Sequence, residues 1–198
     1  LYHEDNFATT AQLNMVWPTL QQYTDDAYAL DFLAEILSSG KKAPLYKVLV
    51  KDKELTSRTT AYNNSQEIAG EFHIIITANN GVNLNDVEAG IFEAFELFET
   101  TGVTDRDIER IKAGLETSFY YGISTVLGKA FQLAQYNVFA GDPSFIEQDI
   151  ENIKKKYQMV RKVFLENPSA DPEELAEQVK GILKEMKEIK KRCRYFKN

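Results

Sequence analysis

The sequence predicts an α+β domain in which an antiparallel sheet packs on a layer of helices. Segments with the alternating polarity of strands are few, and all of them fall before residue 80. From residue 85 onward, apolar residues recur with the period of a helix. The predicted order is β-α-α-β-β-α-α-α, followed by two further helices. Because the helices are grouped rather than alternating with the strands, this order is typical of an α+β layer and not of a parallel sheet.

The first strand is predicted around Leu13–Trp17, where Leu13, Met15 and Trp17 share one face. Pro18 has no backbone donor and is predicted to end the ladder. Asp25 and Asp26 suit the first turn of a helix. The buried face of that helix is expected to consist of Ala27, Leu30, Leu33, Ala34 and Leu37. It ends at Ser38-Ser39-Gly40, and Pro44 opens a second helix with Leu45, Val48 and Leu49 inside.

Two further strands are predicted to form an antiparallel hairpin. Residues 58–62 contain three residues that favour strands, and the turn-prone Asn63-Asn64-Ser65 follows them. The second strand, residues 67–78, alternates in polarity. One of its faces is expected to carry Phe72, Ile74 and Ile76, and the other Glu71, His73 and Thr77.

The helical region is divided by clear start and stop signals. Asn85 with Glu88 resembles a capping box, Gly102 closes that helix, and Thr104 caps the next. Their inner faces are expected to hold Val87, Ile91, Ala94, Phe95 and Phe98, then Ile108, Ile111, Leu115 and Phe119. Gly122 marks a break, after which Leu127, Ala130, Phe131, Ala134 and Val138 continue the period. Asp142 and Pro143 are predicted to start a fresh helix.

The character of the sequence changes after Ile153, and we predict two parts, residues 1–153 and residues 154–198. The second part contains a lysine run, the linker-like Asn167-Pro168-Ser169-Ala170 and a last helix that begins at Asp171. The apolar stripe of that helix is Leu175, Val179, Ile182, Met186 and Ile189. The charge is divided in the same way: residues 1–150 carry 10 basic and 22 acidic side chains, and residues 151–198 carry 13 and 8.

Composition excludes several classes of protein. With 43% hydrophobic residues in a chain of 198, a folded protein is expected, either one large domain or a domain with an appendage. No apolar run is long enough for a membrane span. The acidic body argues against nucleic acid as a partner. Cys193 is the one cysteine, so no disulfide framework is expected, and either the bacterial periplasm or the cytoplasm fits. The first residue is Leu1 and no basic-then-apolar leader follows it, so either a signal was removed or the chain is an excerpt of a longer protein, and we favour the excerpt.

The residues needed for hydrolytic chemistry are missing. A zinc hydrolase needs several His or carboxylate ligands and a Glu that activates water, but the chain has only His3 and His73, in different elements. We interpret His3-Glu4-Asp5 as a polar terminal segment, His73 as a surface histidine and Cys193 as a chance thiol. No Gly-x-Ser-x-Gly or phosphate-binding loop occurs. Most aromatic residues are expected in the core. Tyr120, Tyr121, Gln132, Gln135 and Tyr136 form a weak candidate binding surface.

Several segments, taken in their order, resemble a non-catalytic domain of the insulinase/pitrilysin family of zinc metallopeptidases, over roughly residues 4–153. They are Asn14–Thr19, Asp31–Leu37, Ser39–Leu49, Asp107–Lys112 and 128–149, of which Tyr136–Asp142 is the most distinctive. The resemblance implies that the zinc motif lies in a catalytic domain of the same polypeptide. It also implies that this domain closes over a peptide substrate to form a chamber. After Ile153 the resemblance ends.

Within the family, many partner domains supply an Arg and a Tyr to the active site. The resemblance places Val50 and Ser57 at those positions. A valine side chain donates no hydrogen bond and a serine is too short to replace a phenol, so no catalytic residue is assigned here. The fragment is predicted to contain no catalytic, metal or cofactor site and to be inactive alone.

The first functional hypothesis is therefore a structural, substrate-enclosing domain of a zinc metalloendopeptidase. The alternative is a stand-alone interaction or assembly module that keeps the fold and binds its partner through the C-terminal helix. A self-contained hydrolase with an unfamiliar site is the third hypothesis.

Overall fold

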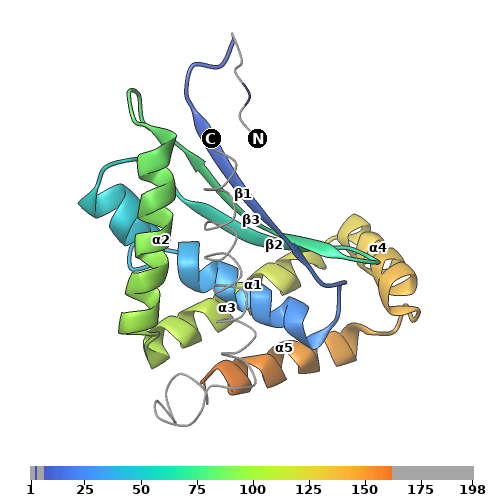
Figure 1. Cartoon of the computed structure of the whole chain (residues 1–198). Helices are drawn as coiled ribbons and strands as arrows, with labels where there is room; N and C mark the ends of the chain where they lie inside the picture. Colours follow the sequence, from blue (N-terminus) through green and yellow to red (C-terminus); the bar gives the residue numbers. More distant parts are fainter. Residues whose placement is uncertain (1–2, 4–6, 162–198) are drawn as a thin grey trace.

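The computed structural model describes residue 3 and residues 7–161, and it confirms the predicted α+β class. Three strands lie over α1 (Asp25–Ser38), and α3 (Asp105–Gly122) and α5 (Ile146–Arg161) lie beyond α1 on the same side of the sheet (Figure 1). The elements in chain order are β1 (Gln12–Thr19), α1 (Asp25–Ser38), the π-helical η1 (Tyr46–Asp52), β2 (Thr60–Ser65), β3 (Gly70–Thr77), α2 (Leu84–Thr101), α3 (Asp105–Gly122), α4 (Val126–Gln135), the π-helical η2 (Tyr136–Ala140) and α5 (Ile146–Arg161).

The sheet has the order β1-β3-β2, and both pairs are antiparallel. The prediction that Pro18 ends the first strand is wrong, because pairing continues through Pro18 opposite Glu71 to Thr19 opposite Gly70. β1 is an edge strand of this sheet. A proline is tolerated there because the outer edge needs no backbone donor.

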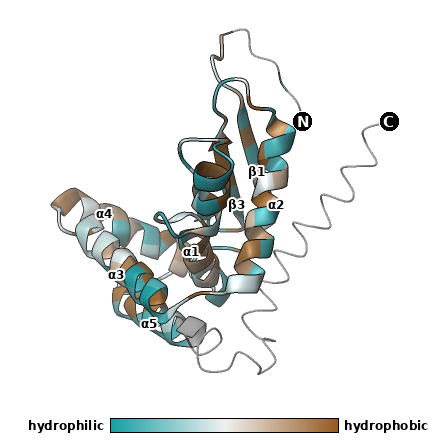
Figure 2. Cartoon of the chain, turned by 90° about the vertical axis from the view of Figure 1, so that its left-hand side faces the viewer, coloured by the Kyte–Doolittle hydropathy of each residue, from teal (hydrophilic) through white to brown (hydrophobic). Residues whose placement is uncertain are grey.

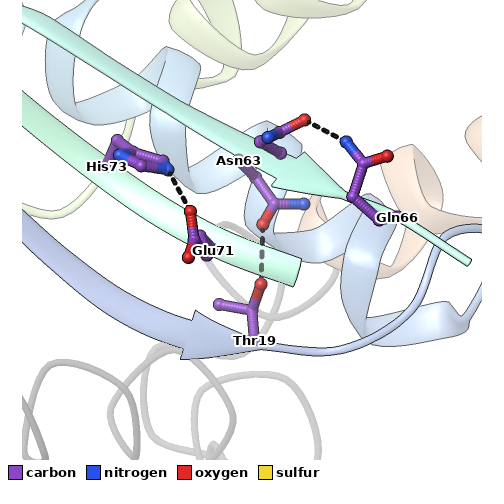
Figure 3. A network of polar contacts seen from close by, with 6 residues as sticks. Thr19, Asn63, Gln66, Glu71 and His73 are labelled. Carbon is purple, nitrogen blue, oxygen red and sulfur yellow. Dashed lines mark hydrogen bonds and ion pairs between the residues drawn. The ribbon is translucent and has the colours of Figure 1, made fainter. Parts of the chain in front are cut away.

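The turn predicted at residues 63–65 is also wrong, because these residues form the end of β2. Asn63 stays in the strand since its side chain is held by neighbours. Its Nδ2 donates to Ser65 Oγ at 2.9 Å. Its Oδ1 accepts from Thr19 Oγ1 at 3.1 Å, the contact drawn in Figure 3. The chain reverses instead at residues 66–69, where the Gln66 amide donates to the Ala69 carbonyl at 2.9 Å.

One face of the sheet packs against α1, η1 and α2 to form the core. The predicted inward face of β3 is confirmed, since Phe72, Ile74 and Ile76 are fully buried, and Trp17 of β1 packs with them. The predicted inner faces of the first helices are confirmed as well. Their buried members include Leu30, Leu33, Leu37, Leu45, Val48, Leu49, Val87, Ile91, Ala94, Phe95 and Phe98.

Helix starts agree with the sequence signals in part. Thr104 caps α3 as predicted, and Asp25 and Asp26 occupy the first turn of α1. α2 begins earlier than predicted, since its cap is Asn83, whose side chain accepts from the Asn85 amide. α5 begins later than predicted, at Ile146. Asp142 instead accepts hydrogen bonds from the amide and hydroxyl of Ser144 and so stabilises the turn before the helix.

The inner face predicted for α4 is exposed. Leu127 and Phe131 are each 67% exposed, and α4 has no buried residue at all. In Figure 2, brown segments on α4 mark its hydrophobic residues. The residue that enters the interior is Tyr136 of η2, which is fully buried although it was predicted as part of a polar surface. Periodicity identified the helix correctly, but it could not show which side faces the protein.

The predicted boundary at residue 153 falls inside α5, and Tyr157 beyond it is buried in the core. The division into two parts stays a prediction. The last predicted helix, its apolar stripe and Cys193 lie outside the described residues. Within the described part of the chain, no helix has the length and apolar character that a membrane crossing requires.

Candidate functional site: the open face of the sheet

The second face of the sheet is the best candidate for a functional surface, and we call it the open face. Side chains alternate along a strand, so residues that flank the buried ones point to this side. Val16 and Tyr62 are 47% and 39% exposed here. Cross-strand register places the residues of the open face in three rows, which are Pro18–Glu71–Asn64, Val16–His73–Tyr62 and Asn14–Ile75–Thr60.

His73 lies at the centre of the open face. Its ring stacks on Tyr62 at a centroid separation of 4.7 Å and an interplanar angle of 12°. Its Nε2 lies 3.1 Å from Glu71 Oε2, as Figure 3 shows. The side chain of His73 is only 15% exposed, so it is more covered than the surface histidine that its position in the alternation predicted. This row offers the aromatic ring of Tyr62 and the apolar side chain of Val16 to a ligand, and the neighbouring row adds the carboxylate of Glu71.

The outer edges of the sheet adjoin the open face. Among the described residues, neither β1 nor β2 pairs with another strand along its outer edge. Unpaired edge amides and carbonyls are the groups that an extended peptide uses when it adds to a sheet. The open face therefore combines backbone hydrogen-bonding capacity with side chains that could contact alternate residues of such a peptide.

The residues present do not fit a zinc site. Of the two histidines, His73 has one carboxylate neighbour and His3 is exposed. Across the residues that the structure describes, no three His, Cys, Asp or Glu side chains gather closely enough to hold a metal ion. Glu4 and Asp5, which adjoin His3 in the sequence, fall outside the described part.

Val50 and Ser57 do not come together into a polar site. Val50 is half-buried in η1, and Ser57 is exposed in the loop between η1 and β2. Neither side chain can place a cationic or phenolic donor over a substrate. The structure therefore offers no reason to assign a catalytic role to either residue.

A buried polar cluster that sequence analysis missed joins α1 to the end of the helical layer. Asp149 of α5 is 5% exposed and accepts hydrogen bonds from Tyr28 at 2.5 Å and from Tyr136 at 2.7 Å. Burial, with added effects of Asp149, raises the pKa of both phenols well above the ordinary range, and it raises the pKa of Tyr23 to about 12. The phenols therefore stay protonated and donate.

The role of this cluster is to position helices. Tyr23 and Phe145 pack their rings on Tyr136 at centroid separations of 5.4 and 5.7 Å, which closes the cluster to solvent. No sequence signal indicated Asp149 or Tyr28, because each looks like an ordinary member of its own helix. Only the contact between residues 121 positions apart reveals the cluster.

A family model and several solved structures point to the same protein family. A family model described as the peptidase M16 inactive domain matches residues 1–115. No curated protein matches the chain. Among solved structures, a protease from Helicobacter pylori is similar with a TM-score of 0.66 and 18% identity over 80% of this chain and 39% of its own.

Two further structures support the same fold. The peptidase M16 inactive domain from Pseudomonas fluorescens has a TM-score of 0.61 and 14% identity over 80% of this chain and 38% of its own. The inactive peptidase domain of a Bordetella parapertussis protein has a TM-score of 0.65 and 16% identity, and the match covers 80% of this chain and 86% of that one. The chain thus spans about two fifths of the first relative's length and most of the Bordetella domain.

Proposed function

Because the chain belongs to the peptidase M16 inactive-domain family, we propose that this non-catalytic domain encloses the peptide substrate of a zinc metalloendopeptidase. The proposed partner is a catalytic domain of the same polypeptide, and zinc is expected in that domain. The family match agrees with the predicted resemblance to insulinase-like proteins. The limited share of the Helicobacter protease that this chain covers supports a parent with further domains.

The observation that carries the proposal is the contrast between the two faces of the sheet. One face packs against helices, and the other presents Val16, His73 and Tyr62 beside unpaired strand edges. A wall of this kind can contact an extended peptide and exclude water without taking part in chemistry. Among the described residues, no three His, Cys, Asp or Glu side chains lie close enough together to hold a metal ion.

The proposal is tested with the full chain and an unfolded model polypeptide. We expect hydrogen exchange to slow at the outer-edge amides of β1 or β2 when the polypeptide is added, and we expect no cleavage. Exchanging Val16→Glu together with Tyr62→Glu should weaken this protection. The matched control is Val126→Glu with Tyr121→Glu, two exposed apolar residues outside the sheet. Equal protection in both variants, or protection confined to the helices, would overturn the substrate-facing role of the open face.

A second candidate function is an assembly module, and one observation favours it. Large side chains with apolar surface are exposed on α4 and at the end of α3, including Tyr121 at 81%, Val126 at 86% and Phe131 at 67%. Exposed apolar patches mark interaction surfaces. Under this hypothesis a second copy of the chain covers α4. Light scattering after size exclusion should then show a dimer that Phe131→Glu dissociates, and a monomer at every concentration would remove this candidate.

A further inference from the structure

A cavity of about 390 Å³ opens on the helical side of the molecule, away from the open face of the sheet. It lies between the end of α1, η1, the end of α2 and the start of α3. Apolar side chains line part of the cavity, and we call four of them, Leu97, Phe98, Val103 and Ile111, its apolar floor. Its volume falls in the range of ordinary ligand sites.

Cations are concentrated around this cavity. The charged residues that line it are Lys41, Lys42, Lys47, Lys51, Arg110 and a single acid, Asp107. We call it the cationic cavity. Residues 1–150 contain only 10 basic side chains against 22 acidic ones, so half of the basic residues in this acidic region line one cavity.

The lysines of the cavity are available to a ligand. Within the described part of the chain, no carboxylate oxygen lies within 4.0 Å of any of the four lysine ammonium groups. By contrast, Lys53, which directly follows η1, pairs with Glu93 at 2.7 Å. All four lysine residues are exposed. Four neighbouring, uncompensated ammonium groups repel one another, and a bound anion would relieve that repulsion.

Hydrogen bonds to Ser39, the residue after α1, fix the guanidinium group of Arg110. Its Nη2 donates to the Ser39 carbonyl at 3.0 Å and its Nη1 lies 3.4 Å from Ser39 Oγ. The neighbouring Gly40 has a φ of +88°, and a Cβ there would lie 3.5 Å from Arg110 Nη1. A guanidinium carries five N–H donors, so those not used by Ser39 remain for a ligand.

The layout of the charges distinguishes between kinds of anion. The cations come from three separate segments, the turn after α1, η1 and α3, so one small anion could contact only some of them. A chain that bears several carboxylates could contact them all, and its apolar side chains could enter the apolar floor. Nucleic acid fits less well, because the body of the protein is acidic and the lining offers no exposed aromatic ring for stacking a base.

We propose that the cationic cavity binds an acidic peptide segment of another polypeptide, with glutamate or aspartate side chains on the lysines and Arg110 and an apolar side chain on the floor. This accessory site lies on the opposite side of the sheet from the open face. It does not depend on the proposed function, and it requires no catalytic domain.

The test is fluorescence anisotropy with the full chain and a short labelled peptide of glutamates with interspersed leucines. We expect the peptide in which every Glu is replaced by Gln to bind about tenfold more weakly or worse. We also expect Lys47→Glu with Lys51→Glu to weaken binding of the acidic peptide by about tenfold or more. The matched control is Lys129→Glu with Lys154→Glu, which changes the net charge equally at exposed residues outside the cavity.

Three outcomes would overturn the proposal. The first is equal weakening in both charge-reversal variants, which would assign the effect to overall charge alone. The second is an oligonucleotide of equal charge that binds the wild-type chain as tightly as the peptide does. The third concerns the protein's own acidic stretch, Asp171-Pro172-Glu173-Glu174. If neutralising its acids to Asn and Gln tightens peptide binding about tenfold, that stretch is the occupant. Unchanged thermal unfolding of the variants shows that they remain folded.

Discussion

Tyr28 at the start of α1 donates its phenolic hydrogen bond to Asp149 of α5 across 2.5 Å, although the two residues are 121 positions apart. Both are buried, at 6% and 5% exposure. Tyr28 and Tyr136 together provide hydrogen-bond donors to the buried carboxyl group of Asp149. Burial of that group without such partners would cost folding free energy. The sheet rests on α1, so the Tyr28–Asp149 contact links the helical layer to the support of the open face.

We expect Tyr28→Phe to lower the free energy of unfolding by about 2 kcal/mol, because it leaves a buried acceptor with one donor fewer. Urea denaturation measures this change. Tyr121→Phe is the control, since Tyr121 is 81% exposed and its hydroxyl is in solvent. That variant should stay within about 0.5 kcal/mol of the wild type. Equal effects of the two substitutions would contradict the importance of the buried contact.

Asp31 should make stability depend on pH. Burial raises its pKa to about 7, the charges of Asp149 and Glu35 add to the rise, and the hydrogen bond from Asn63 opposes it. Since the folded pKa lies above the unfolded value of about 3.9, stability is fully present below pH 4 and is lost as pH rises to about 7.

Asp31→Asn removes this charge and keeps an acceptor for Asn63. We expect the variant to be more stable than the wild type at pH 8, by an amount on the order of a few kcal/mol, and to match it near pH 4. Thermal unfolding at a series of pH values measures the difference. Glu96→Gln removes an exposed acid of α2 as the control. A constant difference between Asp31→Asn and the wild type at all pH values would contradict the raised pKa.

Substitution by alanine should have opposite effects on stability at two helical glycines, Gly90 and Gly114. A Cβ at Gly90 of α2 would lie 2.6 Å from Leu49 Cδ2 and 3.4 Å from Leu55 Cδ1, and Leu49 is fully buried. We expect Gly90→Ala to destabilise the protein by about 1–3 kcal/mol through overpacking. Gly114 of α3 has no neighbour within 4 Å of such a Cβ. Gly114→Ala should stabilise by about 0.5–1 kcal/mol through helix propensity. Chemical denaturation of the pair checks both signs, and the same sign for both would contradict the packing of η1 on α2.

The exposed position of α4 predicts a contrast between two phenylalanines. Phe95 is fully buried and Phe131 is 67% exposed. Phe95→Ala should cost about 3–5 kcal/mol, because it leaves a cavity in the core. Phe131→Ala should change stability by less than about 0.5 kcal/mol in the monomer. Thermal unfolding measures both variants, and a large loss for Phe131→Ala would show that α4 packs against the body.

The parts of the fold that depend on local pattern could be predicted from the sequence. Phe72, Ile74 and Ile76 alternate along one strand, and the apolar residues of α1 recur with helical period, so both buried faces were correct. The errors arose where tertiary context decides. Pro18 stays in its strand because β1 is an edge, and Asn63 stays because Thr19 and Ser65 hold its side chain. Neither fact is visible in a local window of sequence.

The same distinction applies to the candidate site. The alternation of β3 placed His73 on the less buried face, but its stacking on Tyr62 depends on register across two strands. Phe131 was predicted on the inner face of its helix but is exposed. An apolar stripe identifies one face of a helix, but it does not show which surface that face packs against. The local sequence predicts Tyr136 on a polar surface, because its buried acceptor, Asp149, lies in the next helix and is invisible in a local window.

The central claim is that this domain of the M16 family is a scaffold and not a catalyst. The most direct measurement is the zinc content of the purified full chain after it is washed with chelator, supplied again with zinc and desalted, together with a peptide-cleavage assay of the same sample. The account predicts zinc well below one ion per chain and no cleavage above background. Stoichiometric zinc with cleavage that chelator abolishes would contradict it.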